Sequence, residues 1–385
     1  MTMMPATATG TIGWLLANVA EIVDLPPDMY EAADEQYRLV GQFLADRSGG
    51  DGWDVYPQGS IRLGTVVRPF VGDEGFDLDM VCRRNILKTS TTQEKLKDEV
   101  GDALAEYLEA NEASPGAPHL CTPSRRCWTL HYLIDFHMDV LPAIPDPDAT
   151  PTGILLTDKR LTRWLTSDPI AYTTWFRSRM ATEFLQRKAA LATEMRKSIE
   201  QVPDWQVKTT LQQLVQVLKV HRDLHFLHDL DDRPPSILIT TLAAYAYDGD
   251  GDLFDAILHV VAHMADYIES SSSGPRVTSP VSDENFADKW SDYPQREHKF
   301  RSWLDKVTID LEEAAGTSGL RAVTARLGES FGTERVTKAA AQIGIETREL
   351  RETGRLGVIG GGAALSTAAV AAKIPKHGFY GATPR

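Results

Sequence analysis

Asp77 and Asp79 are separated by a single apolar residue, Leu78, in a stretch where Leu78, Met80 and Cys82 recur at every second position. This period of two predicts a β-strand. Because successive side chains on a strand point to opposite faces, both carboxylates project from the same face. Two adjacent carboxylates repel each other unless a cation lies between them, and oxygen ligands of this kind suit Mg²⁺ or Mn²⁺. The pair therefore predicts a divalent metal site.

A small-residue turn, Gly59-Ser60, precedes the aspartate pair in the chain. Gly59 allows the backbone to approach a ligand closely or to adopt a positive φ angle. We expect Ser60 to be the N-cap of a short helix that begins at Ile61, whose free N–H groups would meet phosphate oxygens. Each signal alone is weak, since a lone Asp-x-Asp is most often a solvated strand edge or a turn. In this order and at this spacing the two resemble the signature of the polymerase-β-like nucleotidyltransferases.

Asp139 is the candidate for a third carboxylate of the same site. It lies in the run His137-Met138-Asp139-Val140-Leu141, which alternates like a strand. The alternative is an aspartate at a strand end that is paired with another side chain. Asp135, between two apolar runs, is expected to serve the turn that joins them rather than the site.

The elements that must position these residues change in type along the chain. Helices are predicted over 26–46 and 91–110, strands over 53–56 and around Asp77, and a hairpin from the runs 127–134 and 136–141. After a proline-rich connector at 145–148, only helices are predicted, over 171–197, 207–227, 236–247, 253–268, 295–315 and 320–344. The expected fold class is α+β, and the cleft between the two parts is the default ligand site.

Three parts are expected along the chain. A nucleotidyltransferase catalytic core with a long N-terminal helix spans residues 1–150, a helical lobe spans 151–345, and a flexible tail spans 346–385. Residues 356–372 carry no charge and are rich in Gly, Ala, Ser and Thr. Such small side chains favour a flexible linker over a membrane span.

Composition excludes several classes of protein. The chain has 385 residues, of which 40 are Lys or Arg and 54 are Asp or Glu, for a formal net charge of −14. An acidic protein is a poor candidate for non-specific binding of DNA or RNA. His119, Cys121 and Cys127 lack a fourth ligand and a standard spacing for zinc. Residues 1–18 lack the basic start and long apolar run of a signal peptide, so we expect a cytoplasmic location.

With these motifs assembled, the chain resembles the bacterial cGAS/DncV-like nucleotidyltransferases (CD-NTases), the cyclic-oligonucleotide synthases of CBASS anti-phage systems. The resemblance covers roughly residues 55–290. Besides the turn and the three aspartates, it rests on the segments Leu218–Asp223 and Pro234-Pro235-Ser236, and more weakly on Ser279–Asp288.

The resemblance implies a polymerase-β-like core with a helical second lobe and an active site between them. It implies that Asp77, Asp79 and Asp139 are catalytic and hold two Mg²⁺ or Mn²⁺ ions. The residues implied to meet the nucleotide are Gln58, Gly59, Ser60, Lys219 and Ser236. Without the resemblance, Lys219 would be interpreted as a solvated lysine on an amphipathic helix, Ser236 as an N-cap, and Asn285 as a turn residue.

The implied reaction joins NTPs, ATP or another, into a cyclic di- or trinucleotide with release of pyrophosphate. We expect no nucleic-acid activator and no membrane partner. Two alternatives remain: a nucleotidyltransferase that modifies an RNA, a protein or a small molecule, and an inactive nucleotide-binding scaffold. Residues 377–381 suit a CBASS operon partner that acts on the tail, although the chain ends in Thr-Pro-Arg rather than in Gly or Ala.

Overall fold

The computed structural model describes the chain apart from residues 1–7, 48–51, 71–74, 125, 134–135, 158–163, 273, 354–356, 360–363, 367–371 and 374–385. The helices of the described part are α1 (Ala8–Val23), α2 (Pro27–Arg47), α3 (Gly59–Leu63), α4 (Gln93–Asn111), α5 (Pro169–Ser178), α6 (Ala181–Met195), α7 (Thr210–His225), α8 (Ser236–Ala246), α9 (Leu253–His263), α10 (Gln295–Ala315), α11 (Leu320–Phe331) and α12 (Thr333–Glu352). The main strands are β1 (Trp53–Gln58), β2 (Phe76–Arg84), β3 (Leu120–Pro123), β4 (Trp128–His131), β5 (Phe136–Pro145), β6 (Ile154–Leu156) and β7 (Leu165–Ser167).

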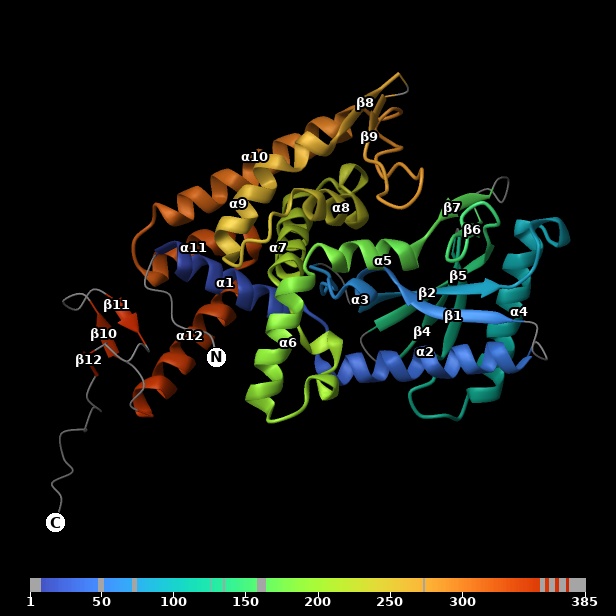
Figure 1. Cartoon of the computed structure of the whole chain (residues 1–385), viewed down its shortest axis with the longest axis horizontal. Coiled ribbons are helices and arrows are strands. Elements are labelled where there is room, and N and C mark those ends of the chain that lie inside the picture. Colours follow the sequence, from blue (N-terminus) through green and yellow to red (C-terminus); the bar gives the residue numbers. More distant parts are fainter. Residues whose placement is uncertain are drawn as a thin grey trace, which may run out of the picture.

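A mixed sheet forms one end of the molecule, and helices form the other (Figure 1). Within the described residues the strand order is β1-β2-β5-β4-β3, and β6 and β7 continue from β5. The neighbours β2 and β5 run parallel, whereas the other pairs in this sheet are antiparallel. The predicted α+β class is confirmed.

Two amphipathic helices, α2 and α4, cover one face of the sheet. Their apolar residues share a core with inward-facing residues of β2 and β5, such as Leu78, Met80 and Met138. The helix α2 begins directly after Pro26, as the sequence predicts, and Thr92 caps α4 by accepting from the Lys95 N–H. This packing fixes which face of β2 is buried, and therefore leaves Asp77 and Asp79 on the opposite face.

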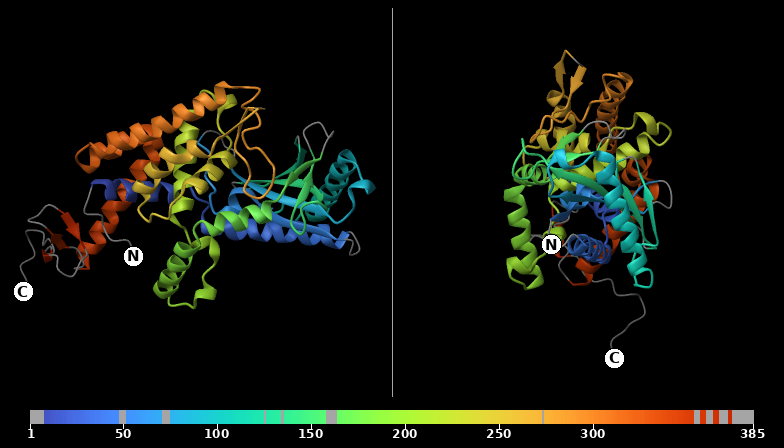
Figure 2. Two further views of the ribbon diagram at one scale, coloured as in Figure 1. Left: turned by 45° about the horizontal axis from the view of Figure 1, so that its top comes forward. Right: turned by 90° about the vertical axis from the view of Figure 1, so that its right-hand side faces the viewer.

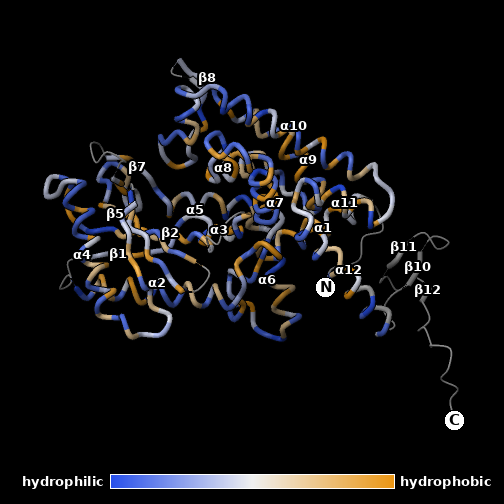
Figure 3. The backbone as a smooth tube through the Cα atoms, turned by 180° about the vertical axis from the view of Figure 1, so that it is seen from behind, coloured by the Kyte–Doolittle hydropathy of each residue, from blue (hydrophilic) through white to orange (hydrophobic). Residues whose placement is uncertain are grey.

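The helical lobe is built around α7, which packs against α1, α8, α9 and α11. Hydrophobic residues gather where α1, α7, α8 and α9 meet (Figure 3). The left-hand view of Figure 2 shows that this lobe and the sheet lie side by side along the long axis. The helix α1 precedes the core in the chain but packs on α7, α9 and α12. The boundaries at residues 150 and 345 stay predictions.

Three sequence predictions about the helices and the tail are wrong in detail. The helix predicted over 171–197 is two helices, because the chain turns at Met180, whose side chain is buried in the lobe core. The helix predicted over 320–344 is also two, because Gly332 adopts a φ of 93° that ends α11. The described parts of the predicted linker pair as short antiparallel strands: β10 (Gly357–Ile359), β11 (Ala364–Ser366) and β12 (Ala372–Lys373).

A short hairpin, β8 (Glu269–Ser271) and β9 (Gly274–Arg276), extends from the helical lobe where the sequence predicted a surface loop. No helix in the described part of the chain combines the length and the apolar character needed to cross a bilayer.

Replacement of Gly332 by Ala should destabilise the fold. The positive φ disfavours any residue with a Cβ, and the added Cβ would lie 2.9 Å from a ring carbon of Phe70. We expect Gly332→Ala to lower the free energy of unfolding by about 1–3 kcal/mol, measured by thermal or denaturant unfolding. Gly344→Ala is the control, since it lies within α12 with open space around it and should stabilise by up to about 1 kcal/mol. Equal stability of the two variants would show that neither the positive φ nor the approach to Phe70 requires glycine at position 332.

Candidate active site

The register of two parallel strands brings the three predicted aspartates together. Asp79 of β2 lies opposite Asp139 of β5, and Asp77 lies opposite His137. Carboxylate oxygens of Asp77, Asp79 and Asp139 all lie within 4.8 Å of one another. Asp139 sits in the middle of β5 and not at a strand end. Asp135 lies outside the described residues.

Asp139 is oriented by two side chains, one on the neighbouring strand β4 and one directly before that strand. Thr129 lies opposite Asp139 in the antiparallel register of β4 and β5, and its Oγ1 donates to Asp139 Oδ1 at 2.5 Å. The Cys127 thiol donates to Asp139 Oδ2 at 3.3 Å. Burial and the Asp139 charge raise the pKa of Cys127 to about 12, so the thiol stays protonated. Sequence analysis did not predict these two residues, although alternation along 127–131 places Thr129 on the strand beside Asp139.

The carboxylate cluster is electrostatically unfavourable by itself. Burial raises the pKa of Asp79 well above its usual range, and the nearby charges of Asp77 and Asp139 raise it further. Like charges at this separation favour uptake of a proton or of a cation. The donor set consists of hard oxygen atoms from three carboxylates, which fits a divalent ion such as Mg²⁺ or Mn²⁺.

Gly59 sits directly against this cluster. Its φ is 63°, and a Cβ on it would lie 2.2 Å from Asp79 Oδ2. Glycine is therefore required here both for the backbone angle and for the close approach. The predicted helix cap is corrected: α3 begins at Gly59, Gln58 occupies the N-cap position without a side-chain cap bond, and Ser60 lies inside the first turn. The turn predicted from Gly59 is present, but the helix starts earlier than expected.

A cavity of about 730 Å³ opens between the core and the helical lobe. The core contributes Gly59, Ser60, Asp77 and Asp79 to its wall. The helical lobe contributes, among others, Lys219, Arg222, Asp223, Arg233 and Ser236. Of the predicted site residues, Gln58 and Asp139 do not line this cavity. The structure thus brings most of the predicted residues to one cleft at the junction of the two lobes.

Lys219 is not the solvated lysine that its helix pattern suggests. Its side chain is 4% exposed, and Nζ donates to the Thr65 carbonyl at 2.9 Å. Burial, with the nearby Arg222 charge, lowers the pKa of Lys219 to about 7, against the opposing influence of Asp223 and Asp79. Burial disfavours the protonated form of Lys219, so an anionic ligand in the adjacent cleft would stabilise that form.

Ser236 is not an N-cap, because Pro235 occupies that position of α8. The Ser236 hydroxyl instead accepts from Arg222 Nη1 at 3.0 Å, and the same guanidinium donates to the Pro234 carbonyl. Arg222 also contacts Asp223. The sequence analysis did not assign a site role to Arg222, although it lies one helical turn after Lys219 on the same face.

The sequence analysis missed His137 as a site residue, whereas Asn285 has the role that its residue type suggests. His137 Nε2 lies 3.3 Å from Asp77 Oδ1 and lines the cavity, but it was not predicted as a site residue. Asn285 holds a turn, as its residue type suggests: its Oδ1 accepts from the N–H groups of Val277 and Ala287, both at 2.9 Å. None of residues 279–288 lines the cavity.

Comparisons with known proteins agree with this geometry. Residues 54–142 match the family described as "Cyclic GMP-AMP synthase DncV-like, nucleotidyltransferase domain". A protein of Roseivirga ehrenbergii named "c-di-GMP synthase" is 28% identical over 376 residues, which cover 95% of this chain and 96% of the relative. The "Cyclic dinucleotide synthase CdnG" of Bradyrhizobium diazoefficiens is 25% identical over 356 residues, or 84% of this chain and 81% of the relative.

Solved structures share the fold. The Bradyrhizobium diazoefficiens CdnG structure in complex with GTP has a TM-score of 0.69 at 22% identity, and the match covers 86% of this chain and 99% of that one. Vibrio cholerae DncV with a nonhydrolyzable GTP has a TM-score of 0.53 at 15% identity, with 87% of each chain covered. The carboxylate cluster, the Gly-Ser turn and these relatives together show that the chain is a nucleotidyltransferase, whose residues 54–142 are similar to the DncV-like nucleotidyltransferase domain.

Proposed function

We propose that this protein joins two nucleoside triphosphates into a cyclic dinucleotide and releases pyrophosphate, as a CBASS-type synthase in anti-phage defence. The observation that carries the proposal is the cluster of Asp77, Asp79 and Asp139, of which Asp77 and Asp79 line a cavity of about 730 Å³. That volume is in the usual range for small-molecule sites. The relatives named as cyclic dinucleotide synthases extend over 84–95% of this chain, so the support is not limited to the catalytic core.

GTP is the substrate to test first. The Roseivirga relative is named a c-di-GMP synthase, and the Bradyrhizobium CdnG structure holds GTP. ATP is the second candidate, since the related Escherichia coli CdnC structure was solved with ATP.

Asp77, Asp79 and Asp139 are proposed to hold two divalent cations, Mg²⁺ or Mn²⁺. When bound, such ions offset the charge of the triphosphate and ease deprotonation of the acceptor hydroxyl. Gly59 and Ser60 would contact the phosphates from the core side, and Gln58 remains a candidate because it directly precedes them. Lys219 and Ser236 would contact them from the helical lobe, where the lysine cation complements the charge of the leaving pyrophosphate.

Asp139 is the proposed proton acceptor for the attacking ribose hydroxyl. Thr129 and Cys127 hold its two oxygens in a fixed orientation, which limits the positions from which a proton can be taken. The ribose oxygen forms a bond to the α-phosphorus as the bond to pyrophosphate breaks. A second transfer of the same kind within the linear dinucleotide closes the ring and releases the second pyrophosphate.

A partner that acts on the tail remains a prediction from the sequence. A related E. coli CdnC was solved in a complex named CdnC:HORMA-deltaN, which supports the idea that enzymes of this fold have protein partners. Residues 374–385 lie outside the described part of the chain.

Incubation with nucleotides alone tests the proposed function. We expect GTP, singly or paired with each other NTP, to give a cyclic dinucleotide in the presence of Mg²⁺ or Mn²⁺, identified by mass and by resistance to phosphatase. No RNA, protein or other acceptor should be needed. Transfer of a nucleotide only when such an acceptor is added would favour the other kind of nucleotidyltransferase, and binding without any turnover would favour a scaffold.

Removal of the paired carboxylates should separate activity from folding. We expect the double variant Asp77→Asn, Asp79→Asn to lose product formation by at least about 10³-fold, since these oxygens are the proposed metal ligands. Its melting temperature in chelator should equal or exceed that of the wild type, because one source of repulsion is gone. Asp98→Asn, an exposed position on α4, is the matched control. Retained synthesis in the purified double variant would overturn the site assignment.

Thr129 should affect catalysis through Asp139. Thr129→Val keeps the shape of the side chain but removes the donor to Asp139 Oδ1. We expect kcat to fall about 10–100-fold and the half-saturating Mn²⁺ concentration to rise. Thr129→Ser, which keeps the hydroxyl, should recover most of the loss. Thr166→Val, an exposed position on β7, serves as a control. If Thr129→Val and Thr166→Val behave alike, the hydrogen bond has no part in positioning Asp139.

A further inference from the structure

One wall of the cavity between the two lobes is formed by a segment that is largely without helix or strand. The chain leaves α3 at Leu63 and runs through residues 64–70 without forming a helix or a strand. We call residues 63–70 the cavity wall, since six of them line the cavity: Leu63, Thr65, Val66, Val67, Pro69 and Phe70. Buried backbone carbonyls need donors, and none of the described strands pairs with this segment to supply them. The donors must therefore come from elsewhere in the molecule.

Side chains of α7 supply those donors. Gln212 Nε2 donates to the Leu63 carbonyl at 2.9 Å, and Gln216 Nε2 donates to the Val66 carbonyl at 2.7 Å. Lys219 Nζ donates to the Thr65 carbonyl at 2.9 Å. The three donors are spaced by four and then three residues, so they lie on one face of the helix.

A fourth donor completes the set just before α7 begins. Lys208 Nζ lies 3.1 Å from the Gly64 carbonyl. Carbonyls of four consecutive residues, 63–66, thus each accept a bond from a side chain that follows them by about 150 residues. We call Lys208, Gln212, Gln216 and Lys219 the donor row.

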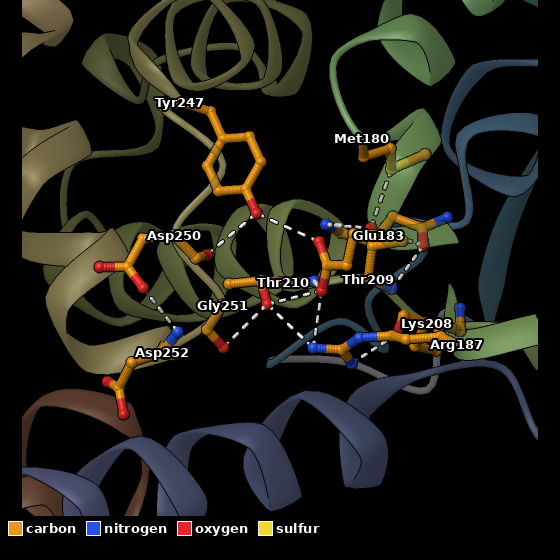
Figure 4. Close-up of polar contacts among 11 residues, drawn as sticks. Met180, Glu183, Arg187, Lys208, Thr209, Thr210, Tyr247, Asp250, Gly251 and Asp252 are labelled. Atoms are coloured by element: carbon orange, nitrogen blue, oxygen red, sulfur yellow. Dashed lines mark hydrogen bonds and ion pairs between the residues drawn. The ribbon is translucent and has the colours of Figure 1, made fainter. Parts of the chain in front are cut away.

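Hydrogen bonds at the start of α7 hold the donor row in place. Gln212 Oε1 accepts from the N–H of Thr209, the N-cap of α7, at 2.9 Å. The start of α7 is also held by Glu183 of α6, whose Oε1 accepts from the Thr210 N–H at 2.8 Å (Figure 4). Arg187 Nη1 donates to the Lys208 carbonyl at 2.6 Å in the same network. A carboxylate at a helix N-terminus also interacts favourably with the helix dipole.

The two glutamines of the donor row are almost inaccessible to water. Gln212 and Gln216 are 6% and 1% exposed, so water cannot readily replace their bonds to the wall. Removal of a buried donor leaves a carbonyl without a partner, which costs more than the bond itself contributes. Loss of one donor would therefore loosen the wall when no ligand is bound.

We propose that Gln212 and Gln216 are positioning residues for the nucleotide, which hold the cavity wall in its binding-competent shape before the ligand arrives. The inference rests on the proposed function, since it takes an NTP as the ligand. A wall that is already ordered adds no ordering cost to binding. Loss of a glutamine donor should therefore weaken nucleotide affinity, and leave the chemical step, which depends on the aspartates of the opposite lobe, nearly unchanged.

Gln216→Met gives the cleanest test, because methionine keeps the unbranched length and removes only the amide. The Gln216 amide donates both to the Val66 carbonyl and, at 3.1 Å, to Asp24 Oδ1, so the variant loses two hydrogen bonds. We expect the dissociation constant of a nonhydrolysable GTP analogue with Mg²⁺ to rise about 10-fold as the wall loses its donor. The KM for GTP should rise to a similar extent, while kcat stays within about 3-fold. Gln213→Met is the matched control: it has the same chemistry on the same helix but no place in the donor row, and it should bind like the wild type.

The outcomes separate this inference from the proposed function. If the wild type binds the analogue and Gln216→Met binds it equally well, even with a lower melting temperature, the glutamine is merely structural and the inference fails. If the wild type binds no NTP analogue, the proposed function fails as well. Should Gln216→Met not fold, Lys208→Met removes the donor to Gly64, together with the ion pair between Lys208 and Asp24, at a less buried position. It is expected to raise the same dissociation constant several-fold, and unchanged affinity would overturn the inference.

Discussion

Mutual repulsion of three carboxylates is the constraint on which this structure depends. The parallel register of β2 and β5 places Asp79 opposite Asp139, and the strand alternation adds Asp77 on the same face. Burial makes the repulsion stronger, as the raised pKa of Asp79 indicates. The fold tolerates the arrangement because the apolar faces of the same strands are tightly packed against α2 and α4. Stability from the core thus supports a site that would be unfavourable by itself, and a cation is the natural partner for it.

The second lobe completes the site with positive charge and with shape. Lys219 and Arg222 extend from α7 toward the cavity, opposite the aspartates. Both are almost fully buried, which lowers the pKa of each and increases the benefit of an anionic partner. Negative charge on one wall and positive charge on the other suit a metal-bound triphosphate. An acidic protein with a net charge of −14 can therefore still bind a polyanion, because local charge and not net charge decides at this range.

The two lobes are joined by side chain to backbone bonds and by apolar contacts, such as the burial of Leu63 in the core of the helical lobe, and no sheet spans both lobes in the described part of the chain. The donor row of α7 contacts the wall that follows α3, and Arg335 of α12 contacts the carbonyls of Arg68 and Pro69 further along the same wall. The wall takes its shape from the helical lobe but belongs in sequence to the core. Such a junction couples the position of the Gly59-Ser60 turn to the position of α7.

The sequence by itself determined the local features: the strand with Asp77 and Asp79, the need for Gly59 at a turn, the hairpin that carries Asp139, and the change from mixed to helical structure. These follow from periodicity and from residue chemistry, which act over a few positions. From the sequence, the start of α3 is predicted at the wrong residue, and α5 and α6, like α11 and α12, are predicted as one helix. The turns at Met180 and Gly332 were missed because they depend on packing partners that are distant in the chain. Only the tertiary structure decided that Lys219 is buried, that Arg222 holds Ser236, and that Thr129 and Cys127 orient Asp139. Each of these depends on which surfaces meet when the lobes pack, and contacts between residues up to about 150 positions apart leave no periodic signal in the chain.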